Sequence, residues 1–110
     1  MRKVEGKMEK QTDAIIEEAV MKIVEMFSPS KVIEYNTKYD MEGELTSFKL
    51  CIVGHIEDRR TMLTRIYNEV DSDIPYDVMF YTDEQFEELK EKSTAFASRI
   101  NQKGRVRYGK

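Results

Sequence analysis

The side chains that could support chemistry are concentrated in residues 32–53, where two apolar stretches flank a polar loop. The loop contains Asp40, Glu42 and Glu44, and Asp40-Met41-Glu42 has the spacing of a paired-carboxylate motif. Carboxylate oxygens are the ligands that divalent cations such as Mg²⁺ prefer. These acids stand in the middle of a loop and not at the rigid start of a strand. A solvated acidic loop is therefore the simpler interpretation.

Two other residues with reactive side chains occur only once in the chain. Cys51 lies inside an apolar run, so we expect a buried thiol, no intramolecular disulfide and a reducing, cytoplasmic setting. His55 follows the same run, and a lone histidine argues against a histidine-based metal site. We interpret it as a residue at the end of a strand.

The C-terminal segment gathers basic side chains in a chain that is otherwise acidic. They are Arg99, Lys103, Arg105, Arg107 and Lys110. A solvated edge strand protected by its charge is the preferred interpretation. Contact with a nucleic acid or an acidic partner is the alternative, although the net charge of −3 argues against a general nucleic-acid binder.

Length and composition predict one domain. The chain has 110 residues, 40% of them hydrophobic and 35% charged, which suits a single core with a solvated surface. No stretch approaches the ~18 apolar residues of a membrane span. We expect residues 1–11 to form a flexible, weakly helical lead-in and residues 12–110 to form the domain.

Periodicity and turn residues predict the elements that position these side chains. A helix capped by Thr12 should end at Ser28-Pro29-Ser30, and Thr82 with Gln85 forms a capping box that opens a later helix. Further helices are expected at 57–70 and 94–103, and strands at 31–36, 48–54, 76–81 and 105–108. This order predicts an α/β (α+β) fold, a small mixed sheet packed by helices.

Three stretches agree in order, spacing and residue type with a known family. They read M-F-S-P-S-K-V-I-E-Y, I-P-Y-D-V-M-F-Y-T-D-E-Q-F-E-E-L-K and S-T-A-F-A-S-R-I-N-Q-K-G-R-V-R-Y-G. From about residue 14 to residue 108 the chain resembles the minimal nucleotidyltransferase (MNT) domains of the polymerase-beta-like superfamily. The resemblance implies a nucleotidyltransferase-like fold. It also implies a setting that is common for such domains, a toxin–antitoxin operon with a helical HEPN partner.

The catalytic signature of that family is altered here. Active members carry Gly-Ser after the first strand, Asp-x-Asp at the second and a further Asp on the third. The carboxylates hold two magnesium ions against a nucleoside triphosphate. By position, Asn36-Thr37 replaces Gly-Ser, Ser47-Phe48-Lys49 replaces Asp-x-Asp, and only Asp77 matches a catalytic residue. Asn36 can adopt the left-handed backbone that Gly provides and Thr37 has a hydroxyl, so a weakened phosphate cradle is conceivable.

Lys49 is the residue that most strongly opposes magnesium. Unit charges about 4 Å apart interact by roughly 4 kcal/mol at an effective dielectric of 20, and a divalent ion doubles the repulsion. We therefore expect no metal site and no cofactor. If the second and third strands are neighbours, as in the family, Lys49 and Asp77 should form a salt bridge across the former metal site.

The resemblance and its departures together imply a pseudoenzyme. We expect a nucleotidyltransferase-like protein that acts by binding a HEPN-like helical partner, a second copy or a nucleotide, in a toxin–antitoxin-like pair. The alternative is an active nucleotidyltransferase that uses Mg²⁺, Asp77 and the loop acids. It would transfer a nucleoside monophosphate from a nucleoside triphosphate (NTP) to a protein or small molecule. A module that binds nucleic acid through its tail ranks below both.

Overall fold

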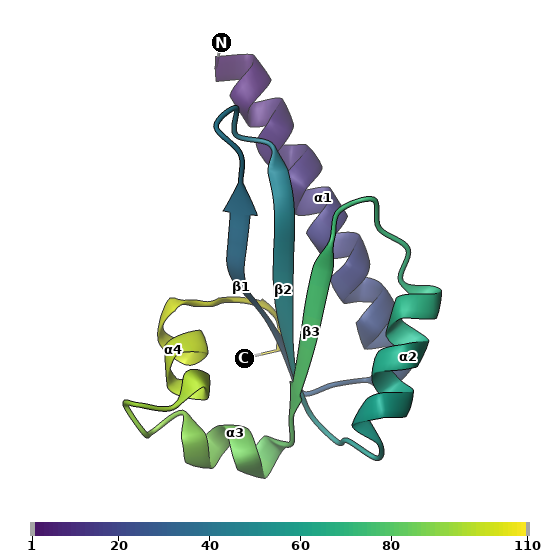
Figure 1. Cartoon of the computed structure of the whole chain (residues 1–110), viewed down its shortest axis with the longest axis vertical. Helices are drawn as coiled ribbons and strands as arrows, with labels where there is room; N and C mark the ends of the chain where they lie inside the picture. The colour runs from purple at the N-terminus through teal and green to yellow at the C-terminus, as the bar shows by residue number, and fades with distance from the viewer. Residues whose placement is uncertain (1, 110) are drawn as a thin grey trace.

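The protein is a mixed α+β domain, which confirms the predicted fold class (Figure 1). The computed structural model describes the backbone of residues 2–109 and the side chains of residues 13–109. Along the chain the elements are α1 (Arg2–Phe27), β1 (Lys31–Tyr39), β2 (Leu45–Val53), α2 (Arg59–Glu69), β3 (Tyr76–Tyr81), α3 (Asp83–Leu89), α4 (Phe96–Lys103) and β4 (Arg105–Tyr108).

The four strands form one sheet in the order β3-β2-β1-β4. β1 pairs antiparallel with β2 on one side and with β4 on the other. β2 and β3 are parallel, and α2 makes the crossover that a parallel pair requires. β2 therefore lies inside the sheet, and its second half is buried on both faces, which explains its nearly continuous apolar sequence.

Helices pack on both faces of the sheet. On the face that we call the α1 side, α1 and α2 cover the larger apolar cluster, which includes Ile23, Phe48 and Ile66. On the opposite face, the α4 side, α3 and α4 cover a smaller cluster around Cys51 and Phe86. α3 and α4 lie at the end of the sheet where β2 and β3 finish, and they leave the part nearer the β1–β2 turn without a helix (Figure 1).

The first helix differs from the prediction at its start. α1 begins at Arg2 and not at Thr12, because the residues before Thr12 are rich in good helix formers and include no proline. The side chains of residues 1–12, which include the predicted lead-in of residues 1–11, lie outside the described part of the chain. The predicted end is confirmed, since α1 stops at Phe27.

The expected polar loop is shorter than predicted, because the hairpin strands continue to Tyr39 and start again at Leu45. The Asp40 amide donates to the Glu44 carbonyl over 2.9 Å, and Gly43 adopts a φ of 85°. The Asp40 carboxylate also accepts the amides of Glu42 and Glu44. The segment that looked like a catalytic loop is a closed hairpin turn.

Later elements follow the predictions closely. β3 and β4 have the predicted bounds, and the Thr82–Gln85 capping box opens α3. α2 begins after Asp58, whose carboxylate accepts the Arg60 amide. Within the residues that the structure describes, no helix is both long enough and apolar enough to span a membrane.

Candidate functional site

A row of three side chains crosses the α4 side of the sheet at the margin of the area that α3 and α4 cover. The register pairs Tyr35 with Lys49 and Lys49 with Asp77. Side chains two residues apart on a strand share a face. Each member of the row therefore lies on the same face as its neighbour in the smaller cluster, Ile33 on β1, Cys51 on β2 and Met79 on β3.

Lys49 and Asp77 form the predicted ion pair. The Lys49 Nζ lies 4.0 Å from Asp77 Oδ2, the outer limit of such a contact. The side chains are 36% and 71% exposed, so the pair contributes at most about 1 kcal/mol to stability. Its importance is positional, because it places a cation beside the only carboxylate that matches the family pattern.

Ser47 shares this face with Lys49. It lies two residues before Lys49 on β2, is partly buried and pairs in register with Lys38. Ser47, Lys49 and Asp77, the positions that the resemblance assigns to the catalytic acids, thus come together, but they present a hydroxyl, an ammonium and a carboxylate. A single carboxylate does not make a two-metal site.

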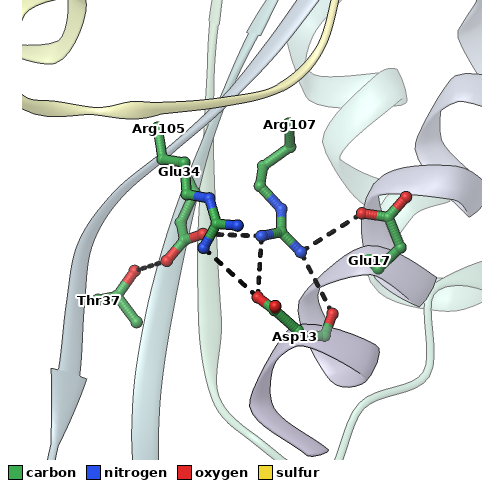
Figure 2. Close-up of polar contacts among 6 residues, drawn as sticks. All are labelled: Asp13, Glu17, Glu34, Thr37, Arg105 and Arg107. Atoms are coloured by element: carbon green, nitrogen blue, oxygen red, sulfur yellow. Dashed lines mark hydrogen bonds and ion pairs between the residues drawn. The ribbon is translucent and has the colours of Figure 1, made fainter. Parts of the chain in front are cut away.

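Asn36 and Thr37 lie at an irregularity in the pairing of β1 with β2. The register shifts between Tyr35 and Lys38, and Asn36 has a φ of 48°, so the expected left-handed backbone is present. The Thr37 hydroxyl donates to Glu34 Oε2 over 2.5 Å. Figure 2 shows that Glu34 belongs to a cluster with residues of α1. The Thr37 hydroxyl is therefore directed to the α1 side, away from Lys49 and Asp77.

The turn acids stand apart from this row. The carboxylate oxygens of Asp40, Glu42 and Glu44 lie within 4.8 Å of one another, and all three residues are exposed. The turn precedes Leu45, and Leu45 lies four residues before Lys49, a separation of about 13 Å along a strand. The ions of a two-metal site lie only about 4 Å apart. The turn acids cannot complete a metal site at Asp77.

Neutral groups surround the row at ordinary pH. Burial raises the pKa of the Cys51 thiol to about 12. Burial, with smaller effects from Cys51 and Asp77, raises the pKa of Tyr35 to about 12. The Tyr35 ring packs edge-on against Phe96 at 5.6 Å. This face offers neither a thiolate nor a phenolate as a nucleophile, but it does offer a polar surface for binding.

Comparisons with protein-family models, curated proteins and solved structures gave no match to the chain. The interpretation of the site therefore depends on the residues and geometry described above.

Arg107 is the polar residue whose position the sequence analysis missed. Its side chain is only 5% exposed, so the prediction of a solvated tail is wrong for this residue. Figure 2 shows the guanidinium of Arg107 between α1 and β1. It contacts Asp13 at 3.1 Å, Glu17 at 3.4 Å and Glu34 at 3.6 Å. Arg105 is 66% exposed, as expected for an edge strand, and lies 3.5 Å from Asp13.

Pairing between β4 and β1 explains the burial of Arg107. β4 runs antiparallel to β1 and carries Arg107 to the α1 side, beside the buried Glu34. One signal in the sequence could have indicated this contact. Glu34 interrupts the apolar strand V-I-E-Y, and a carboxylate inside a buried strand requires a cationic or hydrogen-bonding partner.

Proposed function

We propose that this protein is a catalytically degenerate nucleotidyltransferase-type domain that acts by binding and not by nucleotidyl transfer. The observation that carries the proposal is the Lys49–Asp77 ion pair, at the position where an active member of that family would hold magnesium. An ammonium about 4 Å from a divalent ion repels it, by roughly 8 kcal/mol at an effective dielectric of 20 and by less at a site as exposed to water as this one.

The topology supports the same proposal. An initial helix, an antiparallel hairpin and a parallel β2-α2-β3 unit make β2 and β3 neighbours, as the resemblance requires. Ser47 and Lys49 then lie on the face that carries Asp77. The scaffold is what the family would need, while the residues on it are not the ligands of a two-metal site.

The partner that we propose is a HEPN-like helical protein, in a toxin–antitoxin-like pair, or a second copy of this chain; the setting is cytoplasmic. Nucleotide binding without turnover belongs to the same proposal. The active-enzyme alternative requires further carboxylates beside Asp77, and the acids of the hairpin turn begin about 13 Å from Lys49 along β2.

Calorimetry with Mg²⁺ and nucleoside triphosphates, together with a pyrophosphate-release assay, tests the proposal. We expect no metal-dependent turnover by the natural sequence. The double variant Ser47→Asp/Lys49→Asp, which rebuilds Asp-x-Asp, should gain Mg²⁺ binding. The matched control Thr46→Asp/Lys92→Asp makes the same change in net charge at exposed positions and should not. Turnover by the natural sequence that disappears in Asp77→Ala would refute the proposal.

A further inference from the structure

A groove separates α1 from the end of α2 on the α1 side of the molecule. Its volume is about 660 Å³, within the range of pockets that accept ligand groups or side chains. Its lining residues come from Glu18 to Glu25 of α1 and from Glu69 to Asp71 at the end of α2. The groove lies on the opposite side of the sheet from Lys49 and Asp77, so its role is independent of nucleotidyl transfer.

The floor of the groove is apolar. Ala19 and Val70 are each only 4% exposed, and Val24 is partly buried. Met21 stands at the groove with 53% of its surface exposed. A methionine side chain is flexible and polarisable, and it adapts to the shape of a docked partner. Ala19 and Val70 close the floor, so Met21 and part of Val24 provide the apolar contact surface that is open to solvent.

The rim of the groove is strongly acidic. Four carboxylates, Glu18, Glu25, Glu69 and Asp71, line it together with one cation, Lys22. Glu69 pairs with Arg65 at 3.2 Å. Among the side chains that the structure describes, Glu18, Glu25 and Asp71 form no ion pair. A partner with positive charges on either side of an apolar stripe would complement this rim.

We propose that this groove binds a basic amphipathic helix of a partner protein. Two helices form its walls, and a third helix laid between them would place an apolar stripe against Met21 and the exposed part of Val24, which share a face of α1. Lysine or arginine side chains beside that stripe would meet Glu18, Glu25 and Asp71. This is the helix-in-groove mode of recognition, with apolar anchors for affinity and charges for orientation.

A labelled synthetic peptide tests the proposal by fluorescence anisotropy. The peptide carries leucines at helical i, i+4 and i+7 spacing between flanking lysines, and a scrambled peptide of the same composition removes the stripe. We expect the patterned peptide to bind about tenfold more tightly than the scrambled one, because only the patterned peptide presents a continuous apolar face. Equal affinity of the two peptides, or no binding of the patterned one, would overturn the proposal.

Variants of the protein separate the groove from general acidity. Glu18→Lys/Glu25→Lys should weaken binding by about tenfold or more. The control Glu42→Lys/Glu91→Lys changes the net charge equally at exposed sites outside the groove and should change affinity by less than about twofold. Amide chemical-shift changes on adding peptide should centre on α1 near Met21 and on Val70. An equal loss in both variants, or shifts centred elsewhere, would contradict a groove site.

Discussion

Glu34 and Arg107 bring opposite charges into a part of the molecule from which water is largely excluded. Glu34 belongs to β1 and Arg107 to β4, and α1 supplies Asp13 and Glu17 to the same cluster (Figure 2). Among the described residues, Glu34 Oε1 and Arg107 Nε have no hydrogen-bond partner. Removing Arg107 leaves the buried Glu34 carboxylate with the Thr37 hydroxyl as its hydrogen-bond donor but without a cation, which is more damaging than losing an exposed pair.

We therefore predict that Arg107→Met lowers the free energy of unfolding by roughly 3–5 kcal/mol, the range for breaking a buried ion pair. Arg105→Met is the matched control, because Arg105 is exposed. This variant should lower the free energy of unfolding by less than about 1 kcal/mol. Urea unfolding measures both. Arg107→Met/Glu34→Gln should recover part of the loss. Equal losses for the two arginines would show that the buried cluster has no special role.

Cys51 gives a second prediction at this scale, about pH. Burial raises its pKa from the usual 9.0 to about 12, so the folded state holds the thiol proton more tightly than the unfolded state. The resulting stability is complete below pH 9 and is lost as the pH rises toward 12. Between about pH 8 and about pH 10 the loss should reach about 1.4 kcal/mol.

Cys51→Ala isolates this effect. The variant should be less stable at every pH because of the cavity, but it should lack the Cys51 part of the alkaline loss. Tyr35 and Tyr76, whose pKa values burial raises from 10.0 to about 12, should still destabilise the protein above about pH 10. Urea midpoints at a series of pH values provide the test. Parallel curves for the two proteins below pH 10 would contradict the assignment.

At the scale of single elements, β1 is a strand whose pairing register shifts at Asn36 and Thr37. Its first part follows the apolar pattern that the sequence predicted, but the strand continues past Asn36 to Tyr39. Propensity alone did not predict that extension, because polar residues join the ladder only through pairing with β2. The sequence did not predict the shift in register at Asn36 either, although Asn is among the residues best suited to a left-handed backbone.

The left-handed backbone of Asn36 at this register shift predicts how β1 responds to substitution. Asn36→Val should lower the free energy of unfolding by roughly 1–2 kcal/mol, because a β-branched side chain fits a φ of 48° poorly. Asn36→Gly should be nearly neutral, since glycine adopts that backbone freely. Lys38→Val, an exposed position in the same strand, is the control and should change little. Thermal unfolding distinguishes these outcomes. An Asn36→Val variant as stable as the natural sequence would show that the backbone at Asn36 imposes no conformational strain.

At the scale of the whole molecule, the sequence predicted most elements because each has a strong local signal. The Thr82 capping box, the apolar β2 and the proline after α1 are such signals. The burial of Arg107 and the groove beside Met21 depend on segments far apart in the chain. Such long-range features follow from tertiary packing, which periodicity and propensity do not encode.

The unequal layers on the two faces of the sheet lead to a last prediction. The cluster under α3 and α4 has fewer buried residues than the cluster under α1 and α2, and Phe86 is its largest member. Less buried apolar area gives a lower free energy of local opening. Amides of α3 and α4 should therefore exchange with deuterium faster than those of β2. Phe86→Ala should lower the free energy of unfolding by roughly 3–5 kcal/mol, the usual range for a buried phenylalanine. It should accelerate exchange mainly in α3 and α4. Phe48→Ala should instead affect β2, α1 and α2, since Phe48 lies in the larger cluster. Uniform acceleration by both variants would mean that the two layers open together as one cooperative unit.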